Sequence, residues 1–453
     1  ISANTASGVR INDSGTSGNI IANNVIGLGS DGSWELGNDG DGIYLYESSA
    51  GTVIGPGNVI SGNHHNGIWI DGVNSTQVFG NYIGTNAAGE AARMNEGYGI
   101  MVGNASVNTV IGGDTSAERN IISGNDSYGV YLADSGTNNV TISGNYIGLG
   151  ADGSLALGNN DAGVDIGNGI QNVTIGGDSP GERNLISGNG SYGIAIRGAD
   201  TQGIVISGNY IGTDVSGLLD RGNVDSGVHP YNGVHNILIG GATPNERNVI
   251  SGNDGPGIEF WANSIGVSDA TIKGNFIGLG ADGVTPVGNS GYGIEFDNLA
   301  SNITIGGDND SERNIISANG MHGILLSGSE VSLNTIKGNF VGTDSSGLLP
   351  RGNGGDGIRI EDSAYDNTIG PDNLITNNSW DGVRVDSILS LGNLITENRI
   401  FNNSLEGIKL TNGANNSLPA PSIDDATNKP YQITGTACTG CTVEVFQNPD
   451  DDG

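Results

Sequence analysis

A four-residue phrase recurs fourteen times in this chain: glycine, then isoleucine or valine, one variable residue, and a residue that is usually apolar. Most intervals between copies are 30 or 34 residues, and a few are 25, 32 or 36. A repeat in this range is typical of a solenoid, in which each repeat buries its apolar face only against its neighbours. The phrase begins at Gly8, Gly42, Gly67, Gly99, Gly129, Gly163, Gly193, Gly227, Gly257, Gly293, Gly323, Gly357, Gly382 and Gly407.

One repeat, residues 129–162, contains three short runs typical of strands, GVYL, NVTI and NYIG, separated by Gly, Asn, Asp and Ser. In the first run Val130 and Leu132 alternate with Tyr131 and Ala133, which is the period of a strand with one buried face. The repeat lacks the apolar stripe of an amphipathic helix. Three short strands per repeat predict an all-β fold, a parallel β-helix.

The predicted β-helix has fourteen coils and extends over residues 1–417. Each strand pairs in parallel with its counterpart one coil further on, about 4.8 Å away. The inward side chains should form aliphatic rows, because a coil has no other way to shield them from water. Representative inward residues are Ile43, Val130, Ile194 and Ile324.

The corners between strands are rich in glycine and asparagine, both of which tolerate the left-handed backbone region. A Ser-Gly-Asn or Lys-Gly-Asn corner recurs, and equivalent corners of successive coils should stack their amides into ladders. We favour this structural interpretation over a row of ligand-binding amides. The corner asparagines are Asn63, Asn145, Asn189, Asn209, Asn253, Asn275 and Asn339.

The Gly-Ile-x-Ile, Asn-x-x-Ile and Ile-x-Gly-Asn phrases resemble the right-handed parallel β-helix repeats of the pectate-lyase-like superfamily. The IGTDxxG and IGGxxxxERNxISGN phrases are similar to repeats in large secreted or surface proteins of bacteria. The resemblance covers residues 1–417 and implies a right-handed β-helix in an extracellular or cell-surface location. It leaves function open, because that superfamily includes polysaccharide lyases, hydrolases, epimerases, phage tailspikes and adhesins.

Composition narrows the classes of partner. Sixteen Lys and Arg against 49 Asp and Glu give a net charge of −33, which would repel phosphate and excludes nucleic acid as a partner. No run of 18 apolar residues is long enough for a membrane-spanning helix. The chain begins inside a repeat and stops abruptly, so we interpret it as a segment whose ends are covered by flanking modules of the same protein or by other copies stacked head to tail.

The repeat ends near residue 417, and residues 418–453 introduce prolines and new strand patterns, YQITGT and CTVEVF. This segment predicts the start of an immunoglobulin-like β-sandwich module. Cys438 and Cys441, the only two cysteines, are expected to form a local disulfide. Calcium is the only cofactor considered, with Asp450, Asp451 and Asp452 as its candidate ligands.

Catalytic candidates lie among the outward residues of the first strand of each coil. His229, Glu259, Glu295 and Asp297 should be neighbours there, and a like-charge pair such as Glu259 and Glu295 should raise one carboxyl pKa. A raised carboxyl beside a histidine suits acid–base chemistry on a glycosidic bond.

Two features qualify this hypothesis. Lyases of the superfamily resembled usually place a Lys or Arg base near the carboxylates, and the nearest candidate, Arg359, lies two coils beyond Glu295. In addition, Pro230 stands where the strand pattern expects an inward aliphatic residue, and proline is unusual within a strand.

The same outward rows contain aromatic residues that could stack against sugar rings: Tyr44, Tyr46, Trp69, Tyr131, Tyr231 and Trp261. The sequence therefore leaves three functions open. The first is a structural or adhesive segment of a large bacterial surface or secreted protein, favoured because the repeat is almost undisturbed and an active site usually disturbs one. The second is a polysaccharide-active enzyme, either a lyase, a hydrolase or an epimerase. The third is carbohydrate binding without turnover.

Overall fold

The computed structural model describes residues 1–13, 15–47, 49–418, 422–425 and 434–436. Beyond the solenoid it describes one antiparallel pair of short strands, β42 (Ser422–Asp425) and β43 (Thr434–Thr436). The predicted immunoglobulin-like module lies largely outside the described residues. The predicted disulfide between Cys438 and Cys441 and the calcium ligands Asp450, Asp451 and Asp452 lie entirely outside them.

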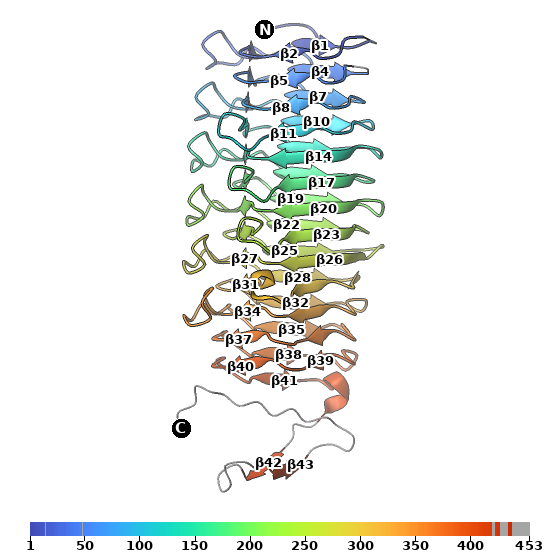
Figure 1. Ribbon diagram of the computed structural model, residues 1–453, viewed down its shortest axis with the longest axis vertical. Helices are drawn as coiled ribbons and strands as arrows, with labels where there is room; N and C mark the ends of the chain where they lie inside the picture. The colour runs from blue at the N-terminus through green and yellow to red at the C-terminus, as the bar shows by residue number, and fades with distance from the viewer. Residues whose placement is uncertain (14, 48, 419–421, 426–433, 437–453) are drawn as a thin grey trace.

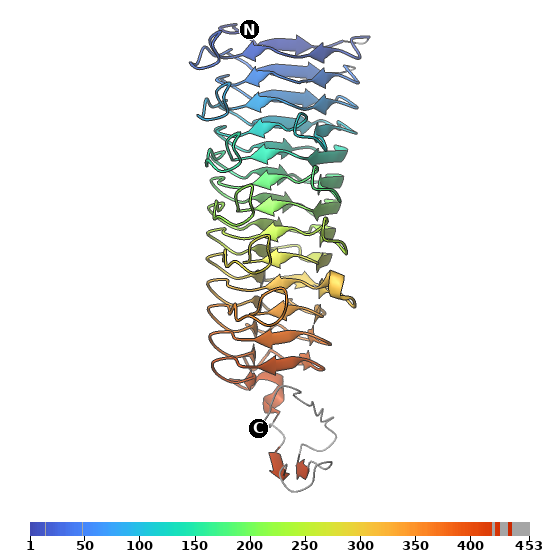
Figure 2. The same cartoon turned by 60° about the vertical axis from the view of Figure 1, so that its left-hand side comes forward.

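The strands between Val9 and Leu410 form the predicted right-handed parallel β-helix, an elongated stack of coils with three strands in almost every coil (Figures 1 and 2). Its first sheet, sheet A, has 14 parallel strands, and each begins directly after one of the fourteen phrase glycines. These strands are β1 (Val9–Ile11), β4 (Ile43–Tyr46), β7 (Ile68–Asp71), β10 (Ile100–Gly103), β13 (Val130–Leu132), β16 (Val164–Ile166), β19 (Ile194–Arg197), β22 (Val228–Tyr231), β25 (Ile258–Trp261), β28 (Ile294–Asp297), β32 (Ile324–Ser327), β35 (Ile358–Glu361), β38 (Val383–Val385) and β41 (Ile408–Leu410).

Sheet B contains the second strand of each coil: β2 (Ile20–Ile21), β5 (Val53–Ile54), β8 (Gln77–Val78), β11 (Val110–Gly112), β14 (Asn138–Ser143), β17 (Gln171–Gly176), β20 (Gln202–Ser207), β23 (His235–Gly240), β26 (Val267–Lys273), β29 (Ala300–Ser301), β30 (Thr304–Gly306), β33 (Thr335–Lys337), β36 (Thr368–Ile369) and β39 (Leu394–Ile395). Sheet C contains the third: β3 (Val25–Ile26), β6 (Val59–Ile60), β9 (Tyr82–Ile83), β12 (Ile121–Ile122), β15 (Tyr146–Ile147), β18 (Leu185–Ile186), β21 (Tyr210–Ile211), β24 (Val249–Ile250), β27 (Phe276–Ile277), β31 (Ile315–Ile316), β34 (Phe340–Val341), β37 (Leu374–Thr376) and β40 (Arg399–Phe401).

Helical structure in the described residues is confined to two short 3₁₀ turns, η1 (Asp310–Glu312) and η2 (Ala414–Ser417). Neither they nor any other described segment forms a helix long and apolar enough to cross a membrane.

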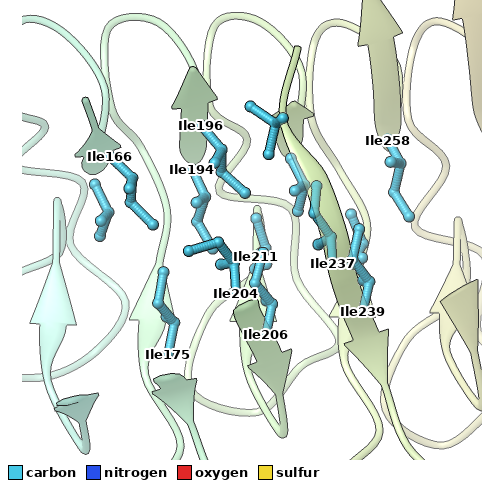
Figure 3. Close-up of a cluster of buried hydrophobic side chains, with 14 of the residues drawn as sticks. Ile166, Ile175, Ile194, Ile196, Ile204, Ile206, Ile211, Ile237, Ile239 and Ile258 are labelled. Atoms are coloured by element: carbon cyan, nitrogen blue, oxygen red, sulfur yellow. The ribbon is translucent and has the colours of Figure 1, made fainter. Parts of the chain in front are cut away.

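The core consists of stacked aliphatic rows, as the alternation within the strands predicts. Ile43, Val130, Ile194 and Ile324 are all fully buried. Figure 3 shows the isoleucines of neighbouring coils packed against one another inside the helix. β-branched residues pack well on the buried inner faces of parallel strands. The narrow core of this β-helix can therefore be filled without many aromatic residues.

The aliphatic row of sheet A is interrupted at β22, where Pro230 points inward. The register pairs Val228 with Ile258, and Pro230 lies opposite Phe260 of the next coil. Proline has no N–H to donate to the ladder. Phe260 and Phe296 follow it in the core, and their ring centroids are 5.0 Å apart. These two rings are the largest fully buried side chains among the described residues.

Two long asparagine ladders run along the corners, one between sheets B and C and the other between sheets C and A. A shorter third ladder runs from Asn334 through Asn367 to Asn393 between sheets A and B. In each, an Nδ2 group donates to the Oδ1 of the asparagine one coil further on, as from Asn145 to Asn184 and from Asn63 to Asn95. The predicted amide ladders are confirmed. Asn145, Asn209, Asn275 and Asn339 belong to the first ladder, whereas Asn63, Asn189 and Asn253 belong to the second.

Six insertion loops follow the third strand of every second coil and are closed by antiparallel bridges such as Leu28 to Glu35. These loops bond to one another; for example, the Ala87 N–H donates to the carbonyl of Gly32 at 3.0 Å. Gly89 and Gly153 of these loops lie against the rings of Tyr82 and Tyr146 on sheet C, so the loops form a spine over the outer side of sheet C and not over that of sheet A. Trp34 and Glu90 lie exposed on this spine.

Candidate functional site

The outward residues of sheet A form two rows in register. We call these two rows, together with the residue that precedes each phrase glycine, the sheet A face. The first row runs through Tyr44, Trp69 and Met101 and continues coil by coil through Tyr131 and Asp165. In the second row Arg197, Tyr231, Trp261 and Asp297 follow one another. All four catalytic candidates and all six aromatic candidates predicted from the sequence lie on this face.

An aromatic cluster occupies β4 and β7. The ring of Tyr44 stacks on Trp69 at 4.7 Å and on Tyr46 at 5.8 Å. The Tyr44 hydroxyl donates to Asp71 Oδ2 at 2.7 Å, and burial together with this bond raises the pKa of Tyr44. Each of the three rings is half-buried, so the cluster holds its rings in place while leaving part of each one accessible.

A second cluster joins Tyr131 to two tyrosines that the sequence analysis did not single out. Tyr98 and Tyr128 stack in parallel at 5.5 Å, and Tyr131 lies 4.9 and 5.4 Å from them. Both additional tyrosines stand immediately before a phrase glycine, as do Tyr192 and Tyr292. That recurrence of Tyr-Gly was a signal visible in the sequence.

A buried ion pair lies beside this cluster. Arg197 Nη2 is 2.9 Å from Asp165 Oδ1, and the Arg197 guanidinium also donates to the hydroxyls of Tyr131 and Tyr231 at 3.3 and 3.4 Å. The Asp165 side chain is only 3% exposed. Burial raises its pKa to about 7, against the opposing effect of the Arg197 charge. The pair therefore fixes two aromatic rings from different coils in one orientation.

His229 lies outside the core but is covered by aromatic rings. Its imidazole stacks between Tyr192, at 4.3 Å, and Tyr231, at 4.8 Å, and its side chain is only 6% exposed. Its Nδ1 lies 3.1 Å from Glu259 Oε2, without the alignment of a hydrogen bond. The outward position of His229 was predicted correctly. The ring of Tyr192, from the corner that precedes β19 in the preceding coil, nevertheless shields the histidine from solvent.

The two glutamates occupy paired positions on β25 and β28 and have opposite pKa shifts. Burial would raise the pKa of Glu259, but its contacts with His229 and with the Ser226 hydroxyl lower the pKa below its ordinary value. Burial and the neighbouring Glu259 charge raise the pKa of Glu295 to about 8. At neutral pH the pair therefore holds one carboxylate and one carboxylic acid.

The side chains around Glu259 and Glu295 do not place a lysine or arginine beside them in the described part of the chain. Asp297 lies next to Trp261 in register, and burial followed by the Glu259 charge raises its pKa. Arg359, the candidate base considered from the sequence, is engaged by Glu361 and Asp356 on the C-terminal coils. Among the residues the structure describes, no group of three or more His, Cys, Asp or Glu side chains is arranged to hold a metal ion.

Comparison with known proteins gives fold-level likenesses. Neither family models nor curated proteins match the chain. Among solved structures, the Dettilon tailspike protein gp208 is 18% identical with a TM-score of 0.44 over 82% of this chain, which spans 62% of the tailspike chain. The A-module of the Azotobacter vinelandii mannuronan C-5 epimerase AlgE6 is 15% identical, with a TM-score of 0.40 and 87% and 89% of the two chains covered. The Streptococcus pneumoniae surface protein and adhesin PfbA is 14% identical, with a TM-score of 0.31 and 86% and 91% covered.

Proposed function

We propose that this β-helix is an adhesive, extracellular segment of a larger bacterial surface or secreted protein and that its sheet A face binds an extended glycan chain. The observation that supports this proposal is the series of half-buried aromatic rings on that face, from Tyr44 and Trp69 through Tyr131 and Tyr231 to Trp261. Aromatic faces pack against the apolar C–H faces of sugar rings. Parallel strands are about 4.8 Å apart, which is similar to the length of one pyranose unit.

The rings are arranged in a way that favours binding. They are held by mutual stacking and by the Asp165–Arg197 pair, so little side-chain freedom is lost when a ligand binds. The tyrosine hydroxyls and the Arg197 guanidinium lie at the same face and can bond to sugar hydroxyls. A fixed track of alternating apolar and polar groups suits a long, repetitive ligand.

We expect Trp69→Ala and Tyr131→Ala each to weaken binding of a glycan roughly tenfold, because each removes a stacking surface together with its buried area. The measurement is titration calorimetry of the wild type and both variants against a panel of neutral, amino and acidic polysaccharides. Trp34→Ala is the matched control, since Trp34 is 53% exposed on the insertion-loop spine away from this face. If Trp34→Ala weakened binding as much as the other two, the face would be wrongly assigned.

A second candidate function, hydrolysis of a glycosidic bond, is favoured by the opposite pKa shifts of Glu259 and Glu295. A protonated carboxyl beside an ionised one is the pairing that glycosidases use, with Glu295 as the acid and Glu259 as the carboxylate. If the chain is a hydrolase, Glu259→Gln and Glu295→Gln should each lower the rate of appearance of new reducing ends by about 100-fold or more. Binding without new reducing ends, unsaturated products or epimerised units across the panel would refute this candidate and leave the binding proposal standing.

A further inference from the structure

We infer that the part of the sheet A face formed by β22, β25 and β28 selects glycans that contain free amino groups, such as unacetylated hexosamine polymers, over acetylated or uronic acid polymers. In this inference the ammonium group is held by Glu259, Glu295 and Asp297 beside the ring of Trp261. The inference rests on the proposed function, because it names the chemical class of glycan that the same face would bind.

The first argument is that this region gathers carboxyl groups with little positive charge nearby. Burial and the Glu259 charge keep Glu295 protonated at neutral pH, and a bound ammonium group would favour its ionised form. Three carboxyl groups lie on two neighbouring strands, with Glu259 paired to Glu295 and Trp261 paired to Asp297 in the register. Within the described part of the chain, the ion pairs of these three groups are limited to the contact of Glu259 with His229. The nearby arginines are committed elsewhere, Arg197 to Asp165 and Arg359 to acidic residues of its own coils.

The second argument is that one buried polar atom in this region lacks a hydrogen bond. His229 Nδ1 is buried and has no hydrogen bond, although it lies 3.1 Å from Glu259 Oε2. Glu295 itself is half-buried, so its carboxyl group stays accessible to a ligand. Leaving a buried polar atom unsatisfied costs free energy, so a ligand that supplies hydrogen-bond partners is favoured.

The chemistry of an ammonium group fits these features. It carries three donors and no acceptor, whereas ionised carboxylates only accept. Charge-assisted bonds between the two are stronger than neutral ones. Trp261, which lies directly beside Asp297, adds a cation–π surface. A uronate carboxylate would instead meet three acidic side chains on a chain with a net charge of −33.

The test compares a hexamer of β-1,4-linked glucosamine with its fully N-acetylated counterpart and with a hexagalacturonate, by calorimetry on the whole chain. The free-amine hexamer is expected to bind at least about tenfold more tightly than the acetylated one, with the uronate weakest. In the double variant Glu295→Gln/Asp297→Asn the preference should fall below about twofold. The control, Glu35→Gln/Glu90→Gln, removes two charges from exposed loop positions and should retain the preference.

The possible outcomes separate this inference from the proposed function. Equal affinities for the amine and acetylated hexamers, with binding still sensitive to Trp69→Ala, would overturn the amino-glycan inference alone. Tighter binding of the uronate would do the same. If the loop double variant lost the preference as fully as the face double variant, non-specific attraction to the acidic chain would be the cause and the inference would be wrong. Absence of binding to any of the glycans would refute the proposed function itself.

Discussion

Gly176→Ala is expected to destabilise the β-helix by several kcal/mol and to prevent its central coils from packing correctly. A Cβ atom on Gly176 would lie 1.8 Å from the carbonyl oxygen of Ser207 in the next coil, a distance that no side-chain rotation can relieve. The residue also has a φ of +90°, which strains any residue with a Cβ atom. Backbone strain costs on the order of 1–3 kcal/mol, and separating two paired strands costs additional hydrogen bonds.

The matched control is Gly51→Ala, which measures the cost of the left-handed backbone conformation without the steric clash. Gly51 has a similar left-handed φ of +69°, but the nearest atom to an added Cβ lies 4.0 Å away. We therefore expect it to cost only about 1–2 kcal/mol. Urea denaturation followed by far-ultraviolet circular dichroism measures both variants against the wild type. Equal destabilisation by the two substitutions would show that strand spacing at Gly176 relaxes freely, contrary to the packing described above.

The fold could be predicted from the sequence because a solenoid repeats one local solution. The phrase glycines, the alternation of Val130 and Leu132 with Tyr131, and the Asn corners each recur at fixed positions, so every coil reinforces the same interpretation. All fourteen strands of sheet A begin where the phrase predicts. The inward position of Pro230 was also visible, and aligning the phrase at Gly227 with the one at Gly257 places Pro230 opposite Phe260, as the observed register does.

The candidate site could be predicted only in part. Alternation shows which side chains point outward, and register follows from the repeat, so the adjacency of Glu259 and Glu295 was predictable. The covering of His229 by Tyr192 was not, because that tyrosine belongs to a corner whose direction no strand pattern describes. Without that cover, the burial of the histidine could not be anticipated, whereas a raised pKa at one carboxyl of the Glu259–Glu295 pair was predicted and is found at Glu295.

The Asp165–Arg197 pair illustrates the same difficulty. The two residues stand on consecutive strands but in different outward rows, so simple adjacency does not pair them. Their contact depends on the diagonal reach of the Arg197 side chain toward Asp165 and Tyr131, whereas Tyr231 lies directly opposite Arg197. Long side chains can bridge such diagonals, whereas the repeat pattern records only which residues lie directly opposite.

Asn209→Leu is expected to destabilise the β-helix by about 5 kcal/mol, because it breaks an amide ladder at a buried position. The Asn209 Nδ2 group donates to the Ile175 carbonyl at 2.8 Å and to Asn248 Oδ1 at 3.1 Å, and its Oδ1 accepts from Asn184 Nδ2 at 2.9 Å. Leucine has a similar volume but none of these groups. Several buried donors and acceptors would then be left without partners, each at a cost of about 1–3 kcal/mol.

The loss of stability caused by Asn209→Leu should be confined to the coils around the broken ladder, so it is measured coil by coil. Each coil contacts only its neighbours, so the damage should appear first as local opening around the broken ladder and not as a uniform loss. Hydrogen exchange should show reduced protection of amides in β17, β20 and β23, whereas β38 and β41 keep theirs. The same substitution at Asn24, a half-buried residue of that ladder, is the control. It should cost about 1 kcal/mol, because the Asn24 amide is itself partly exposed and Asn58 Oδ1 still accepts from the Asn24 backbone N–H at 3.0 Å. Uniform loss of protection along all coils would mean that the β-helix unfolds as one cooperative unit. An equal cost of the substitution at Asn24 would mean that burial of the ladder at Asn209 adds nothing to its stability.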